Sequence, residues 1–240
     1  MPFEISLATD VGRIRSGNED SAEVIELADG ALCVVADGMG GHQAGEVASH
    51  VAVEAIRQAF AGGSARGPDA LVAAIEAANR AVYDEAGADA AKQGMGTTVV
   101  CALLTASRAD LANVGDSPAY LVRGKGARQL THDHSWVAEE VARGELSERE
   151  AAVHPYRHVL TRCLGLTPGV EVETYAPLEL EPGDVLVLCS DGLSEHVRAD
   201  ELPGVVGNRS PEEAARALID LANRRGGSDN ITVVVARWQP

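Results

Sequence analysis

The stretch ALCVVADG, residues 31–38, joins an apolar run to a carboxylate at its end. Apolar and β-branched side chains bounded by Asp and Gly predict a buried strand that ends near Asp37. The same combination of an apolar run and an aspartate recurs in DLANVGDS (110–117), DVLVLCSDG (184–192) and SDNITVVVARW (228–238). These four segments predict core strands whose acidic ends are candidates for a shared site.

Further strands are predicted between these segments. TTVVCALL (97–104) is apolar and β-branched, and 23–27, 119–123 and 171–175 have a similar character. The ADG at 28–30 predicts a hairpin turn. Consecutive strands with short connections favour antiparallel sheets.

Helices are predicted to interrupt the strands, over 45–60, 67–86, 135–143, 147–153 and 210–227. The last of these begins with Ser210, Pro211 and Glu213, the pattern of a capping box with proline in the first turn. The two short helices fall within the polar stretch 132–165, which we expect to protrude from the core. No linker or internal repeat divides the sequence. We therefore expect one α+β domain over 1–240, with two mainly antiparallel sheets sandwiched between outer helical layers.

The composition is typical of a folded protein, with 45% hydrophobic and 23% charged residues. The net charge is −16, from 20 Lys+Arg and 36 Asp+Glu, which argues against a nucleic-acid partner. Unpaired carboxylates leave cation binding open.

The sequence predicts neither membrane insertion nor secretion, because it has no run of about 18 apolar residues and no signal peptide. None of the four cysteines (Cys33, Cys101, Cys163 and Cys189) belongs to a CxxC pair. We expect these cysteines to be small buried hydrophobic residues of a protein in a cytoplasmic, reducing environment. A redox or zinc-binding role for them is the alternative.

Asp37, Asp116, Asp191 and Asp229 all lie at the ends of apolar strands. Each alone is more typical of a turn former or a cap. Four together, in segments where Lys and Arg are scarce, favour a site for a hard cation such as Mg²⁺ or Mn²⁺. The glycine-rich run at 37–49 would let backbone atoms approach an ion closely, and it matches neither a dinucleotide-binding motif nor a P-loop.

Six motifs follow one another along the chain: TDVGRIRSGNED, VVADGMGGH, MGTTVV, NVGDSPAY, LVLCSDGLSEHV and GGSDNITVVVA. Their succession, over about residues 6–237, resembles the bacterial metal-dependent (type 2C) Ser/Thr protein phosphatases. The resemblance implies Mg²⁺- or Mn²⁺-dependent hydrolysis of phosphoserine and phosphothreonine by direct attack of a metal-bridging water. It also implies phosphorylated proteins as substrates, and a Ser/Thr kinase that the enzyme opposes.

The resemblance assigns metal ligands position by position. Asp37 would bridge two metals, and the carbonyl of Gly38 would bind the second. Asp191 and Asp229 would complete the shell of the first metal. Asp116, together with Asp191, would hold a third and weaker ion.

The resemblance also assigns supporting roles near the N-terminus. Glu19 and Asp20 would support the metal-bound waters, and Arg15 would grip the substrate phosphate. Arg15 is a suitable group because its planar guanidinium presents a fork to two phosphate oxygens.

Two positions depart from the family pattern. Met39 occupies the place of a histidine that has been assigned as general acid in animal members, and His42 is the nearest substitute. Pro118 follows the GDS motif where arginine is common. The 132–165 stretch matches the mobile flap beside the family's active site.

Two other functions remain open from the sequence alone. The first is a catalytically silent regulatory module of the same fold, which would be expected to lose Asp37, Asp191 or Asp229. The second is an unrelated metal-dependent hydrolase of small phosphoesters. Comparing phosphopeptides with small phosphoesters, with Mn²⁺ and with EDTA, would separate these functions.

Overall fold

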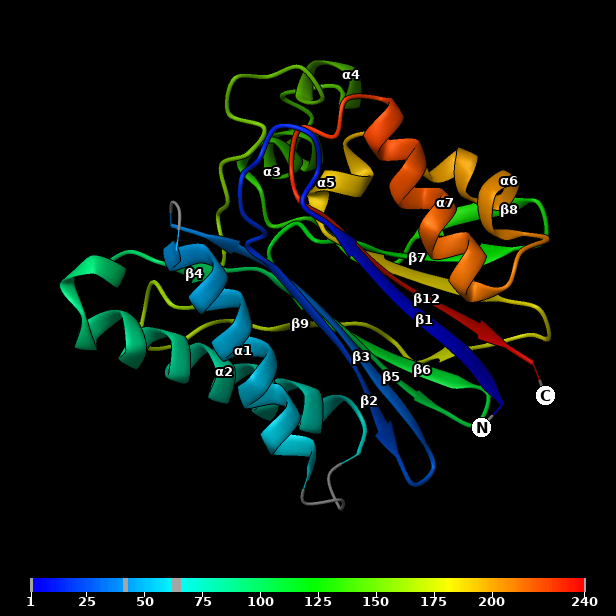
Figure 1. Cartoon of the computed structure of the whole chain (residues 1–240), viewed down its shortest axis with the longest axis horizontal. Coiled ribbons are helices and arrows are strands. Elements are labelled where there is room, and N and C mark those ends of the chain that lie inside the picture. The colour runs from blue at the N-terminus through cyan, green and yellow to red at the C-terminus, as the bar shows by residue number, and fades with distance from the viewer. Residues whose placement is uncertain (1, 41–42, 62–65, 240) are drawn as a thin grey trace.

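Two antiparallel sheets pack face to face, with helices on both outer sides (Figure 1). This computed structural model describes residues 2–40, 43–61 and 66–239. Within these ranges five strands form the first sheet, in the order β1 (Phe3–Asp10), β12 (Ile231–Trp238), β11 (Val185–Cys189), β7 (Ala119–Arg123) and β8 (Gly126–Gln129).

The second sheet contains the hairpin whose turn was predicted at 28–30. Over the described ranges its order is β10 (Leu178–Glu179), β6 (Arg108–Val114), β5 (Val99–Thr105), β3 (Gly30–Met39) and β2 (Asp20–Leu27), with β4 (Gly96–Thr97) on β3 and β9 (Glu173–Thr174) on β6. β2 and β3 pair from Asp20–Asp37 to Leu27–Gly30. The predicted turn at 28–30 is therefore confirmed.

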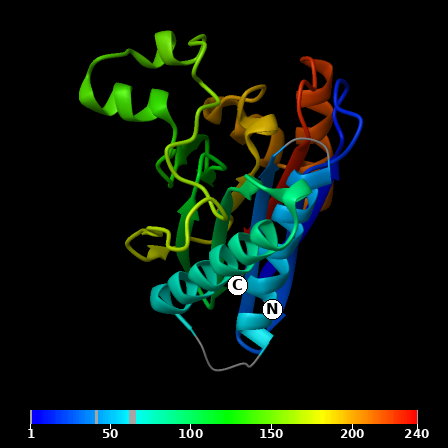
Figure 2. The ribbon, with the colours of Figure 1, turned by 90° about the vertical axis from the view of Figure 1, so that its left-hand side faces the viewer.

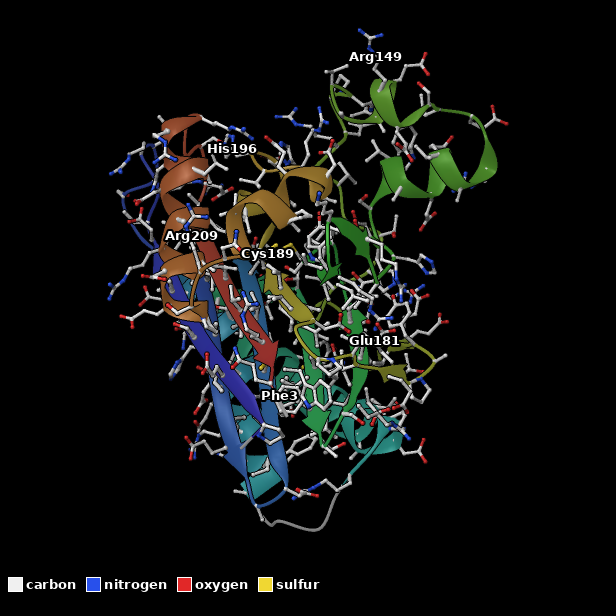
Figure 3. All side chains as sticks on the ribbon, turned by 90° about the vertical axis from the view of Figure 1, so that its right-hand side faces the viewer. Phe3, Arg149, Glu181, Cys189, His196 and Arg209 are labelled. Atoms are coloured by element: carbon white, nitrogen blue, oxygen red, sulfur yellow. The ribbon has the colours of Figure 1, made fainter. Side chains whose placement is uncertain are left out.

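The helices form two outer layers and one projection. α1 (Gln43–Ala61) and α2 (Pro68–Ala88) cover the second sheet, whereas α5 (Asp191–Ser194), α6 (Leu202–Val206) and α7 (Pro211–Arg224) cover the first (Figure 1). α3 (Trp136–Arg143) and α4 (Glu148–Ala151) project beyond the ends of the sheets (Figure 2). Short 3₁₀ turns occur at Ala90–Lys92 and Ala199–Glu201. Arg149 lies at the far tip of the projection, away from the sheets (Figure 3).

Buried apolar side chains form three layers. Between the sheets, Val35 and Val100 belong to the same cluster as Leu186 and Val234. The outer face of each sheet packs on its own helices, as Ile56 of α1 does on the second sheet. A strand that is buried on both faces must be apolar throughout, which explains the continuous apolar runs of the central strands such as β5 and β11. The predicted αββα fold is confirmed.

Some predicted boundaries were wrong. The segment 97–104 is divided at Thr98, whose N–H and hydroxyl both bond to the backbone of Asp37. The strand predicted over 184–192 ends at Cys189, because Asp191 starts α5. β1 was not predicted, although it pairs with β12 over its full length.

The four cysteines are buried and carry free thiols. Cys189 lies within the layered core (Figure 3). The prediction of small buried hydrophobic residues is confirmed. Among the described helices, none has both the length and the apolarity needed to cross a bilayer.

Candidate active site

A cleft of about 950 Å³ lies where the acidic strand ends meet the base of the 132–165 segment. Seven residues predicted from the sequence line this cleft: Arg15, Glu19, Asp37, Gly38, Asp116, Asp191 and Asp229. Asp20 lies behind them, and His42 falls outside the described residues. The cleft therefore brings together carboxylates from both ends of the sequence, such as Glu19 and Asp229.

Asp37 and Gly38 are held at the end of β3 by close backbone packing. The amide of Asp37 donates to Thr98 Oγ1 at 3.0 Å, and the amide of Thr98 donates to the Asp37 carbonyl at 2.9 Å. A Cβ on Gly38 would lie 2.1 Å from the Gly45 carbonyl oxygen and 2.6 Å from that of Glu19. Only glycine fits, so the start of α1 can lie directly against the acidic strand end.

Asp191 and Asp229 are brought together by a second close approach. Asp191 is the first residue of α5, and a Cβ on the next residue, Gly192, would lie 1.9 Å from the Asn230 carbonyl oxygen. Glycine at this position lets α5 pack on the loop before β12. The side chain of Asp229 in turn accepts the amide of Asn230 at 2.8 Å.

Asp20 lies beneath the cleft, opposite Asp37 in the β2–β3 pair. Its Oδ2 accepts the hydroxyl of Ser190 at 2.7 Å, whereas its Oδ1 is buried and finds no hydrogen-bond partner among residues 2–40, 43–61 and 66–239. Burial is the main cause that raises the pKa of Asp20 to about 7, with repulsion from Asp191 and Asp229 adding to it.

Asp116 follows the end of β6. Gly115 has φ +107°, and its amide donates to His134 Nδ1 at 3.0 Å, which fixes the turn that aims Asp116 into the cleft. Burial and the charges of Asp191 and Asp133 raise the pKa of Asp116 well above its usual range.

Without a bound cation, the ionised forms of these clustered carboxylates destabilise one another. Burial, followed by repulsion from the neighbouring aspartates, raises the pKa of Asp37 well above its ordinary value. Burial and the charges of Glu195 and Asp229 raise the pKa of Asp191 to about 6. Asp191 Oδ1, like the buried oxygen of Asp20, has no hydrogen-bond partner among the described residues. Such orphaned buried oxygens fit a divalent cation, because burying an uncompensated carboxylate is costly.

Arg15 provides a cation at the rim of the cleft. Its Nη2 lies 2.8 Å from Asp229 Oδ2, and the side chain is 47% exposed. The bond to Asp229 uses one corner of the guanidinium, so its other N–H groups can face an anion in the cleft. The loop that carries Arg15 is anchored by Arg13, whose amide donates to the Gly227 carbonyl at 2.7 Å.

Asn230 is a positioning residue that the sequence analysis did not single out. Its Nδ2 donates to the carbonyls of Val11 and Gly17 at 2.9 and 2.8 Å, and its Oδ1 accepts the Glu19 amide at 2.8 Å. One amide side chain therefore holds the 11–19 loop against the acidic centre. The sequence feature that could have identified Asn230 is its position directly after Asp229.

Residues of the 132–165 segment also reach the cleft and were not predicted. The segment is closed at its base by the Trp136 amide bonded to the Val159 carbonyl at 2.8 Å and by the Thr161 amide bonded to the His134 carbonyl at 2.9 Å. This closure places His158 in the cleft lining. No ligand was assigned to this segment from the sequence, because nothing local indicated which of its side chains turns inward.

The two departures from the family pattern leave the acidic centre intact. Met39 lines the cleft without a titratable group. Pro118 lacks an N–H, but its carbonyl accepts the Cys189 amide at 3.1 Å, which joins this loop to β11. Asp116 keeps its place in the cleft lining beside the substituted position.

Comparison with known proteins agrees with this fold. Residues 13–227 match the family described as protein phosphatase 2C. The serine/threonine phosphatase stp of Listeria welshimeri is 41% identical over 239 residues, covering 95% of this chain and 92% of that protein. The serine/threonine phosphatase of S. agalactiae superimposes with a TM-score of 0.90 at 37% identity, over 98% of both chains. The PstP catalytic domain, solved in complex with two manganese ions, gives a TM-score of 0.86 at 34% identity over 99% of both chains.

The chain belongs to the protein phosphatase 2C family, which consists of metal-dependent serine/threonine phosphatases. The family membership inferred from the six motifs is confirmed. Dependence on a divalent metal agrees with the orphaned carboxylate oxygens of the cleft.

Proposed function

We propose that this protein hydrolyses phosphoserine and phosphothreonine in proteins, using two Mg²⁺ or Mn²⁺ ions held in the acidic cleft. The observation that carries the proposal is the cluster of aspartates whose pKa values are raised by burial and mutual repulsion; two of them, Asp20 and Asp191, each have a buried oxygen without a hydrogen-bond partner among the described residues. Oxygen ligands of this kind suit hard divalent cations. A guanidinium at the rim adds a group for the phosphate.

The proposed ligands follow the assignment made from the resemblance. Asp37, the Gly38 carbonyl, Asp191 and Asp229 would hold the two ions, with Glu19 and Asp20 supporting their waters from the β2 side. A third and weaker ion would lie at Asp116 together with Asp191. When bound, a metal pair lowers the pKa of a water between the ions and neutralises the phosphate oxygens.

The side chains around the ions would position the phosphoester. Arg15 would bind two phosphate oxygens and hold the phosphorus in line with the attacking water. Asn230 keeps the Arg15 loop at its distance from Asp229 through the three hydrogen bonds described above. His42, which lies outside the described residues, is the proton donor proposed in place of the histidine that Met39 replaces.

The setting of this activity is also part of the proposal. A reaction that removes phosphate from Ser and Thr requires a kinase that adds it, so the substrates would be products of a Ser/Thr kinase. Residues 1–240 would form one catalytic domain, with 132–165 as a flap beside the cleft. Four free thiols suit a reducing compartment such as the cytoplasm.

The test is a substrate comparison under metal control. Phosphothreonine and phosphoserine peptides are compared with a small aryl phosphate, each with Mn²⁺, with Mg²⁺ and with EDTA. We expect metal-dependent release of phosphate from the peptides and none in EDTA. Turnover of the small phosphoester alone would contradict the assignment to protein substrates, and turnover in EDTA would contradict the metal requirement.

A further inference from the structure

We propose that His158, Asp191 and Glu195 form a histidine-containing cation site at the mouth of the cleft, which takes a divalent transition-metal ion. One ligand atom from each of these side chains lies within 4.8 Å of the other two. The site shares Asp191 with both the metal pair and the third ion of the proposed function, and the inference rests on that function's binding of cations at the cleft. Its other two ligands belong to neither that pair nor the Asp116 position.

Two elements bring these side chains together. Asp191 and Glu195 are four residues apart, and the Glu195 amide donates to the Asp191 carbonyl at 2.8 Å, so both project from the same side of the α5 turn. His158 comes from the other direction, on the 132–165 segment. Its Nδ1 lies 3.2 Å from Glu195 Oε1.

An ion pair between His158 and Glu195 explains only part of this arrangement. Arg157 Nε lies 3.8 Å from the same carboxylate, so Glu195 also has a guanidinium beside it. Neither contact involves Asp191, whose Oδ1 is buried and has no hydrogen-bond partner within the part of the chain that the structure describes. A cation between the three side chains would compensate the charges of the Asp191 and Glu195 carboxylates together and give the His158 imidazole an ion to bind.

The ligand chemistry indicates the kind of ion. Carboxylates and waters alone suit Mg²⁺, whereas an imidazole nitrogen shifts preference toward ions such as Mn²⁺, Zn²⁺ or Ni²⁺. The aspartates behind Asp191 add negative potential that attracts a divalent ion to the mouth. We therefore expect this site to prefer a transition metal over Mg²⁺.

The site also has a structural consequence. Asp191 and Glu195 belong to the helical layer on the first sheet, and His158 belongs to the 132–165 segment. An ion bound by all three would tie that segment to the wall of the cleft. The position of the 132–165 segment would then depend on whether this ion is bound.

Pulsed EPR on the Mn²⁺-loaded full chain tests the site directly. The ligands proposed for the metal pair and for Asp116 all bind through oxygen, so modulation from a directly coordinated ¹⁴N reports a histidine ligand. With Mn²⁺ in excess over two equivalents, we expect this modulation in the unmodified protein and its loss in His158→Asn. Glu195→Gln should reduce it, because the ion loses a charged ligand.

His132→Asn is the matched control. His132 also forms a histidine–glutamate pair, with Nδ1 2.8 Å from Glu173 Oε1, and it is outside the cleft lining. The ¹⁴N modulation should persist in this variant. Absence of the modulation in the unmodified protein, or its persistence in His158→Asn, would overturn the proposal.

Calorimetry supplies the second measurement. His158→Asn should weaken a Mn²⁺ binding event beyond the first two by about tenfold or more, and should change Mg²⁺ binding less. An equal change for both ions would contradict an imidazole ligand. The inference requires the cleft to bind cations but does not require turnover. Loss of phosphatase activity with the ¹⁴N signal intact would therefore count against the proposed function alone.

Discussion

Replacing Asp191 by Asn is expected to stabilise the metal-free protein while destroying its metal site. Asn keeps the shape of Asp191 and removes its charge from a buried cluster. Its amide can also donate to neighbouring carboxylates, which Asp191 cannot do when ionised. The same substitution removes a proposed ligand of the metal pair, so its effects with and without metal should have opposite signs.

The magnitude follows from the titration of Asp191. Burial, with repulsion from Glu195 and Asp229, raises its pKa from 3.8 to about 6 in the folded protein. A raised pKa in a carboxyl group means that ionisation destabilises the fold. The penalty is absent below about pH 4, grows between pH 4 and 6, and is constant above that range. Each pKa unit corresponds to about 1.4 kcal/mol, which sets an upper limit of roughly 3 kcal/mol.

Urea unfolding in a chelating buffer, at pH 4 and at pH 7.5, measures this difference. We expect Asp191→Asn to exceed the unmodified protein in free energy of unfolding at pH 7.5 and to equal it at pH 4. Asp84→Asn, an exposed position on α2, is the matched control and should change stability by less than about 0.5 kcal/mol at either pH. A variant equal to or less stable than the unmodified protein at pH 7.5 would refute the argument that this cluster repels itself.

Three further predictions test other contacts of the cleft. Arg15→Ala should lower kcat/KM for a phosphopeptide by about ten- to a hundredfold, from loss of a charged contact of roughly 1.5–3 kcal/mol, and Arg15→Lys should not restore it. An unchanged KM with a lower melting temperature would mean that Arg15 serves only its pair with Asp229. Asp116→Ala should reduce turnover most at low Mn²⁺ while calorimetry still shows two tight sites, and loss of those sites would contradict the third-ion assignment. Gly192→Ala should destabilise the protein by about 1–3 kcal/mol and weaken Mn²⁺ binding, because its Cβ would meet the Asn230 carbonyl at 1.9 Å, and an unchanged melting temperature would contradict this packing argument.

Local signals predicted most of the secondary structure. The capping box at Ser210 is present as expected, with the Ser210 hydroxyl accepting the Glu213 amide, and the strand predicted over 119–123 has those bounds. These features depend on neighbouring residues, so a single sequence contains the necessary information. β1 was missed because its strand character depends on pairing with β12, more than two hundred residues away.

The acidic centre was predictable because its aspartates share one local pattern, an apolar strand followed by a turn. The contacts that place those aspartates were not predictable in this way. Asn230 acts through carbonyls of the 11–19 loop, and His158 reaches Asp191 only because a projecting segment folds back. Such contacts arise from tertiary packing, and no spacing rule within one segment indicates them.

Asp37 lies at the centre of the proposed metal pair, so the proposed reaction depends on it most directly. The decisive measurement is the rate of phosphate release from a phosphothreonine peptide in saturating Mn²⁺, for the unmodified protein and for Asp37→Asn, with circular dichroism confirming that both are folded. We expect turnover by the unmodified protein and a loss of several orders of magnitude in the folded variant. Near-normal turnover by folded Asp37→Asn would contradict the proposed reaction.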